Sequence, residues 1–180
     1  MRTFIKIQFM FVAIACLLIV SCEEAENYIP TDQPVYFEYS YINMAWGFQH
    51  HGWVIDMEGN VRSYDKPENW LSAGEDGLDY DDLLTNISQA DSIIATIDSA
   101  VLSEKIQLIM DAKDGKISPL VGSANDAGSS VLSAIYFDEA TGKYKSVLLA
   151  QSGDFERHNK SRAAESLTEW LKEFDVFWLD

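Results

Sequence analysis

Hydrophobic and polar residues alternate in several short stretches of the chain, which is the period of two expected for half-buried β-strands. The clearest alternation covers residues 35–42, where valine and aromatic side chains fall on one face. Short apolar runs on both sides of a Glu-Gly-Asn turn predict a hairpin over residues 52–64. A second hairpin is predicted over residues 131–150, and together these segments predict an antiparallel sheet of about four to five strands.

Apolar residues recur at helical spacing in other parts of the chain. The helices predicted from this spacing lie at residues 69–71, at 83–87, over 93–109 and from Ser161 onward. The expected fold class is therefore α+β, with the sheet packed against three or four helices on one side. The apolar residues 176–179 are expected to dock on this body, because such side chains are costly to expose.

The N-terminus carries a different pattern. Arg2 and Lys6 precede an unbroken run of 12 apolar residues at 9–20. This run is shorter than the roughly 20 residues that a membrane-spanning helix needs, and it fits a signal peptide instead. Residues 17–22 then read LLIVSC and are followed by an acidic stretch.

Residues 17–22 resemble the lipobox of bacterial lipoproteins, in which the cysteine is lipidated and becomes the first residue of the mature protein. The resemblance implies that residues 1–21 are a cleaved signal peptide and that Cys22 bears acyl chains such as palmitate, so that the membrane is a partner through this lipid. It also implies that the protein is located in the bacterial cell envelope. The acidic residues after Cys22 favour anchoring in the outer membrane over the inner membrane. The alternatives are an ordinary secretory signal, in which Cys22 is incidental, and an uncleaved N-terminal helix.

The rest of the chain divides into two parts. Residues 22–34 are polar and acidic and contain Pro30 and Pro34. They show neither the helical nor the strand period of apolar residues, so they are expected to form a tether. Residues 35–180 are expected to form a single globular α+β domain, because their number suits one hydrophobic core.

Charge and cysteine content narrow the possible partners. The formal net charge is −16 and no stripe of lysine or arginine interrupts it, so nucleic acid is not expected as a partner. Both cysteines, Cys16 and Cys22, lie in the leader or at its cleavage site, which leaves the domain without a disulfide or a thiolate site. We expect no cofactor.

Aromatic residues crowd into one glycine-flanked stretch, residues 44–53, which we take as the candidate ligand-binding loop. A sugar ring or an apolar side chain of a protein partner could stack on aromatic rings there, although a core aromatic cluster is the simpler interpretation. A second long loop, residues 119–130, is a candidate to join it. The candidate binding residues are Trp46, Phe48, Gln49, His50, His51, Trp53, Asn125 and Asp126.

The sequence offers only weak support for a metal site or a catalytic site. The chain has three histidines, His50, His51 and His158. His50 and His51 are adjacent, so in an extended chain they should point to opposite faces and could not both bind one zinc ion. A serine hydrolase built within residues 123–158 would lack a glycine-flanked nucleophile. The acidic loop 76–82 lacks the ordered spacing of a calcium loop, so we expect no metal site and name no catalytic residue.

The interpretation that we prefer is a membrane-anchored envelope lipoprotein that acts as a non-catalytic binding or interaction module. A glycan or a protein could be its ligand. The alternatives are an envelope hydrolase acting on peptide or glycan, and a structural or assembly lipoprotein with a protein partner.

Overall fold

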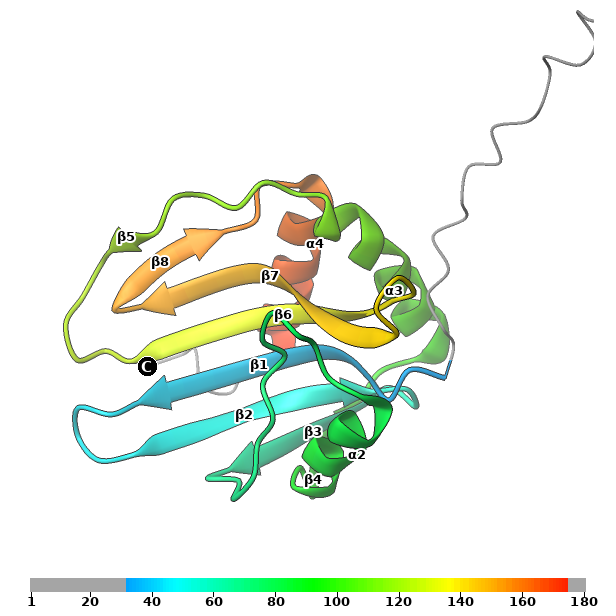
Figure 1. The fold of residues 1–180 in the computed structure, drawn as a ribbon, viewed down its shortest axis with the longest axis horizontal. Helices are drawn as coiled ribbons and strands as arrows, with labels where there is room; N and C mark the ends of the chain where they lie inside the picture. The colour runs from blue at the N-terminus through cyan, green and yellow to red at the C-terminus, as the bar shows by residue number, and fades with distance from the viewer. Residues whose placement is uncertain (1–31, 175–180) are drawn as a thin grey trace, which may run out of the picture.

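A computed structural model describes residues 32–174, which are built around one antiparallel sheet of eight strands (Figure 1). The strands are β1 (Val35–Asn43), β2 (Gln49–Asp56), β3 (Asn60–Asp65), β4 (Ser92–Thr96), β5 (Val121–Gly122), β6 (Ser129–Asp138), β7 (Lys143–Gly153) and β8 (Phe155–His158). Their order across the sheet is β4-β3-β2-β1-β6-β7-β8-β5. Strands β1 and β6 therefore lie at the centre, and each is paired on both sides.

The expected sheet of four to five strands packed on one side against three or four helices is wrong. The sheet has eight strands, and the three α-helices of the described chain cover both of its faces. Helices α3 (Ser99–Lys113) and α4 (Arg162–Leu171) pack on one face, and α4 continues into the 3₁₀ turn η1 (Lys172–Phe174). Helix α2 (Tyr80–Ser88) packs on the other face, which is turned toward the viewer in Figure 1.

The strands missed from the sequence are β4, β5 and β8. Ile93 and Ile94 were assigned to a helix that would run from residue 93 to 109, but they lie in β4, where Ile93 pairs with Arg62 of β3. Isoleucine is β-branched and fits a strand well. Because its spacing here also fits a helix, the pairing with β3 decides between the two conformations. Helix α3 begins only at Ser99, after the N-cap Asp98 accepts a hydrogen bond from the Ala100 N–H at 2.9 Å.

The helical turn predicted at residues 69–71 is also absent. The segment that joins β3 to α2 is irregular there and crosses the front face of the sheet (Figure 1). The prediction of a helix after Ser161 is confirmed, because the Ser161 hydroxyl accepts the Ala164 N–H at 3.1 Å as the N-cap of α4.

Two hydrophobic cores lie on the two faces of the sheet. The larger core joins the inner side chains of β1, β2 and β6 to α3 and α4, with Trp53, Ile109 and Leu167 fully buried. The smaller core joins Val54 and Ile135 to Leu83 of α2. Helices on both faces explain why so few side chains of the central strands meet solvent.

The first strand begins at Val35, but packing begins two residues earlier. Gln33 is fully buried, and its Nε2 donates a hydrogen bond to the carbonyl oxygen of Ile135 at 2.8 Å. Gln33 and Pro34 therefore belong to the folded body and not to the tether to which the sequence analysis assigned them. The proposed signal peptide, Cys22 and the apolar residues 176–179 lie outside the described residues.

Candidate functional site

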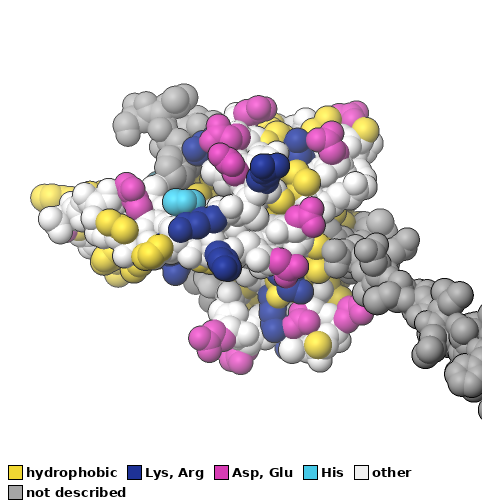
Figure 2. Space-filling view, turned by 90° about the horizontal axis from the view of Figure 1, so that it is seen from above, with side chains coloured by type: hydrophobic (Ala, Val, Ile, Leu, Met, Phe, Trp, Pro, Cys, Tyr) yellow, Lys and Arg dark blue, Asp and Glu magenta, His cyan; other side chains and the backbone are white. Residues whose placement is uncertain are grey.

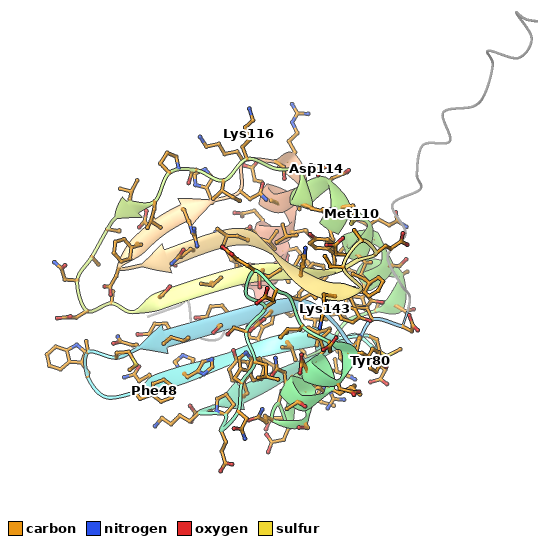
Figure 3. All side chains as sticks on the ribbon, viewed as in Figure 1. Phe48, Tyr80, Met110, Asp114, Lys116 and Lys143 are labelled. Atoms are coloured by element: carbon orange, nitrogen blue, oxygen red, sulfur yellow. The ribbon has the colours of Figure 1, made fainter. Side chains whose placement is uncertain are left out.

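The loop between β1 and β2, residues 44–48, projects from one end of the sheet (Figures 1 and 3), and we call it the tip loop. It exposes three large apolar side chains: Met44 is 71% exposed, Trp46 78% and Phe48 53%. A cluster of apolar side chains exposed on the surface of a folded domain is typical of an interaction site. The loop is tight, because the Ala45 N–H donates to the Asn43 side chain at 2.8 Å.

The loop between β5 and β6 is fixed beside the tip loop. Asn43 Nδ2 donates a hydrogen bond to the carbonyl oxygen of Asp126 at 3.1 Å, and the Tyr41 hydroxyl donates to the carbonyl oxygen of Ala127 at 3.2 Å. On its other side, Asp154 Oδ1 accepts the Ala127 N–H at 2.8 Å. The structure thus brings together the two loops that the sequence analysis named separately.

Asn125 and Asp126 are exposed in this second loop, so both side chains can reach a ligand. Asp126 has a φ of 62°, which lies in the left-handed region that residues other than glycine adopt only at some cost. Val121 of β5, Phe155 of β8 and Leu120, which directly precedes β5, add to the exposed apolar side chains near this end. Figure 2 shows hydrophobic side chains gathered at the end of the molecule that carries β5.

Part of the predicted binding loop is strand, which corrects the assignment of His50 and Trp53. β2 begins at Gln49, so Gln49 to Trp53 alternate between the two faces of the sheet. Trp53 is fully buried in the larger core and cannot belong to an exposed platform, and His50 is only 7% exposed. Gln49 and His51 remain partly exposed, and the His51 ring lies 4.8 Å from that of Tyr41.

A polar cleft of about 550 Å³ opens where the end of β3 passes the start of β4. Its lining comes from β2, β3, the α2–β4 connection and the start of β4, and includes His51, Ser63, Asp65, Gln89, Asp91 and Ser92. The His51 side chain shares a face of the sheet with Tyr41, whereas the Phe48 ring lies 6.1 Å from that of His50 on the other face. We call this cavity the β3–β4 cleft.

A partly buried polar cluster lies on the front face, where the segment that joins β3 to α2 crosses the sheet. Trp70 Nε1 donates to Glu38 Oε1 at 3.0 Å, and the Trp70 ring stacks on Tyr64 with centroids 3.8 Å apart. Burial raises the pKa of Glu38, although the hydrogen bond from Trp70 opposes the shift. Burial lowers the pKa of His50, and the neighbouring charge of His51 acts in the same direction.

These pKa shifts predict how stability depends on pH. The folded-state pKa of Glu38 lies above its usual value of 4.5, so its contribution is greatest below that pH and is lost as the pH rises through the folded-state pKa. We expect Glu38→Gln to be more stable than the wild type at pH 7, with the difference shrinking toward pH 4.5. The measurement is urea unfolding at several pH values, with Glu104→Gln on the exposed face of α3 as control. An equal gain at all pH values would contradict the prediction.

His50 forms a serine–histidine pair that was not found from the sequence, because β2 was expected to begin after it. Ser40 Oγ lies 3.4 Å from His50 Nε2. Ser40 sits within the β1 ladder, opposite Gly52 and Val131, so the backbone beside it already pairs with two strands and forms no turn that could hold an oxyanion. We assign the pair a structural role.

Two serines of the alternative hydrolase interpretation have other partners. Ser123 Oγ donates to Glu156 at 2.6 Å, and Ser129 Oγ accepts from Gln151 Nε2 at 3.0 Å. His158 lines a separate cavity of about 310 Å³ beside α4. Ser161 also lines this cavity, but its hydroxyl caps α4. Within residues 32–174 the structure gives no hydrogen bond between these serines and His158.

The acidic loop 76–82 acts as a helix start. The Asp79 side chain caps α2, and its backbone N–H donates to Asp82 at 2.8 Å. Asp79 Oδ1 also pairs with Lys143 Nζ at 2.8 Å. No group of three or more histidine, cysteine, aspartate and glutamate residues is arranged to hold a metal ion in the described part of the chain.

Sequence reasoning missed the β3–β4 cleft because its residues come from four separate elements and none carries a motif. In residues 32–174, no helix has the length and apolar character needed to cross a membrane. Comparison of the chain with protein-family models and with curated proteins finds no match, so its own geometry must carry the functional argument.

Proposed function

We propose that the protein is a non-catalytic binding module of the bacterial cell envelope, anchored by lipid on Cys22 and binding its ligand at the tip loop. The observation that carries the proposal is the exposure of Met44, Trp46 and Phe48 on one short loop. Each large apolar side chain left in water forgoes about 1.5–3 kcal/mol of burial free energy, which a ligand could recover.

The fixed base of the tip loop also supports binding. Asn43 is buried and hydrogen-bonds both Ala45 within the loop and Asp126 outside it. A loop already held in one conformation loses less entropy when it binds, so more of the contact energy appears as affinity.

The position of the tip loop fits an anchored protein. The described chain begins at the opposite end of β1 from the tip loop (Figure 1). A lipid on Cys22 would hold the domain by its other end and leave the tip loop facing away from the anchoring membrane.

Catalysis is a weaker interpretation, because within residues 32–174 the one contact between serine and histidine side chains is that of Ser40 with His50, inside the β1–β2 ladder. A structural lipoprotein with a protein partner remains the second candidate. A structural lipoprotein would also use the exposed apolar tip loop. The two interpretations differ in the ligand, which for a structural lipoprotein is a stable protein partner.

The binding proposal is tested with the chain from Glu23 onward, which keeps every described residue. A ligand that binds only the folded state raises stability by about 2.7 kcal/mol at a hundredfold excess over its Kd. We expect a thermal-shift screen of envelope glycans and peptides to find a ligand that stabilises the wild type and Tyr80→Ala but not Trp46→Ala. Tyr80 is also an exposed aromatic residue, 44% exposed, and lies far from Phe48 (Figure 3). Equal shifts for all three proteins would contradict binding at the tip.

The anchor is tested by feeding a palmitate analogue to bacteria that express the full chain. We expect the label to enter the wild type and Cys16→Ser, and to be lost from Cys22→Ser, which should leave the membrane fraction. Label retained by Cys22→Ser, or absent from the wild type, would contradict lipidation at that residue.

A further inference from the structure

We infer that the outer edge of β4 binds an extended peptide segment of a partner protein, with uncharged residues in the middle of the segment and a lysine or arginine toward each end. The segment would add a strand to the outside of the eight-stranded sheet. In strand addition the backbone hydrogen bonds supply affinity, and the side chains beside them supply specificity. This surface is separate from the tip loop, so the inference goes beyond the proposed function.

Strand β4 is an open edge of the sheet. It is an outermost strand, and no backbone hydrogen bond joins Ser92–Thr96 to a segment of residues 32–174 other than β3. Proteins usually protect such edges with charged residues, with proline or by making the strand very short. The opposite edge is protected in this way, because β5 has two residues and Pro119 lies just before it. Strand β4 has five residues, of which none is charged and none is proline.

The side chains of β4 suit an uncharged partner strand. Ile93 is 54% exposed and Ile94 is 42% exposed, although both are large and apolar. Ser92 and Thr96 are exposed at the two ends of the strand. A β-branched or apolar side chain on an added strand would pack beside these residues, which is the usual cross-strand contact in a sheet. The middle of the partner segment should therefore be free of charge.

Acidic residues lie at both ends of β4. Asp91 directly precedes the strand and Asp98 follows shortly after it, and both are exposed. Asp91 and Ser92 also line the β3–β4 cleft together with Asp65, and the lining contains no lysine or arginine. Neither Asp65 nor Asp91 forms a salt bridge with a lysine or arginine of residues 32–174. A cationic side chain at each end of the added strand would complement these carboxylates.

A second copy of this chain is a poor occupant of the same edge. Antiparallel pairing of two β4 strands about Ile94 would bring Asp91 of one copy within one residue of Asp98 of the other. Parallel pairing in register would place each aspartate opposite itself. Like charges in such positions destabilise a sheet, and the net charge of −16 on each chain adds repulsion. Charge therefore selects a basic partner.

The test is fluorescence anisotropy with the labelled peptide Lys-Val-Ser-Val-Ser-Val-Lys and the chain from Glu23. Its lysines lie six positions apart, which is the spacing of Asp91 and Asp98 less the one extra residue at the bulge of β4. The peptide reads the same in both directions, so either strand orientation can form. We expect a Kd below about 1 mM. Glutamate in place of both lysines, or proline in place of the central valine, should weaken binding about tenfold or more.

Two protein variants test the edge and the cleft separately. Ile93→Thr keeps a β-branched residue and removes apolar surface, and the double variant Asp65→Asn with Asp91→Asn removes the charge of the cleft. Each should weaken binding about fivefold or more. Val121→Thr is the matched control for the first variant, because Val121 is 59% exposed on the opposite edge strand. It should change Kd by less than about twofold.

The matched control for the cleft variant is Asp111→Asn with Asp114→Asn. These exposed aspartates lie at the C-terminal end of α3, and Asp114 is at the opposite edge of the molecule from β4 (Figures 1 and 3). This control and Trp46→Ala should each change Kd by less than about twofold. Hydrogen exchange of the Ser92–Thr96 amides should slow in the complex, because an added strand bonds to the backbone.

Three binding results would overturn the inference: no binding of the lysine peptide at about 1 mM, equal affinity for the glutamate peptide, or an affinity that neither Ile93→Thr nor the cleft variant changes. Sedimentation of the wild type tests the other occupant. A dimer that Ile93→Thr dissociates would show that the edge pairs with a second copy, and this too would overturn the inference. The proposed function of the tip loop does not depend on any of these outcomes.

Discussion

Replacing Trp53 with alanine should lower the free energy of unfolding by about 3–5 kcal/mol, the range measured when a large aromatic side chain is removed from a packed core. Trp53 is fully buried in the larger core, where its ring lies 5.7 Å from that of Tyr39 and 6.4 Å from that of Phe174. Trp46→Ala, at an exposed position, should change stability by less than about 0.5 kcal/mol. Urea unfolding followed by circular dichroism measures both.

The variant Trp53→Phe should have a stability between those of the wild type and Trp53→Ala. It keeps a ring in the core and removes the indole N–H, for which the described residues offer no hydrogen-bond acceptor. It should therefore cost clearly less than Trp53→Ala. A Trp46→Ala protein as unstable as Trp53→Ala would mean that Trp46 is packed and is not available to a ligand.

Gly52→Ala should destabilise the protein by at least about 3 kcal/mol, because the added methyl group has no space. It would overlap the carbonyl oxygen of Tyr39 and lie 2.6 Å from the hydroxyl oxygen of Tyr64. The Tyr64 hydroxyl donates to that same carbonyl at 3.3 Å, so both neighbours are held in place. Thermal and urea unfolding give the measurement.

Gly74→Ala is the matched control, since nothing lies within 4 Å of a Cβ at that position and its backbone is not left-handed. It should be neutral or slightly stabilising, because alanine restricts the unfolded chain. A loss below about 1 kcal/mol for Gly52→Ala would show that β1 and β2 can separate without cost.

Local patterns were sufficient for the elements whose side chains repeat clearly. The alternation at residues 35–42 predicted β1, the two hairpins contain β2, β3, β6 and β7, and Ser161 marked the start of α4. The isoleucines at 93 and 94 fit either a helix or a strand, and only β3, which is distant from them in sequence, selects the strand. β8 reads Phe-Glu-Arg-His and β5 has two residues, so neither has a period to detect.

The candidate site was predictable in part for the same reason. Trp46 and Phe48 stand out because glycine flanks them and no strand pattern includes them. Trp53 has the same side chain as Trp46, and only the alternation within β2 shows that one is core and the other is exposed. The β3–β4 cleft depends on how separate elements meet, which residue spacing does not encode.

The burial of Gln33 has a mechanical consequence for an anchored protein. A pull on a ligand at the tip loop would be opposed at the lipid, and the load would pass along β1 from Asn43 to Gln33. The inter-strand hydrogen bonds of β1 run perpendicular to that direction, to β2 on one side and to β6 on the other, so they would be strained together in shear and not opened one by one. If the proposed lipid anchor is present, the strand between it and the tip loop would also be one of the two strands at the centre of the sheet, each paired on both sides.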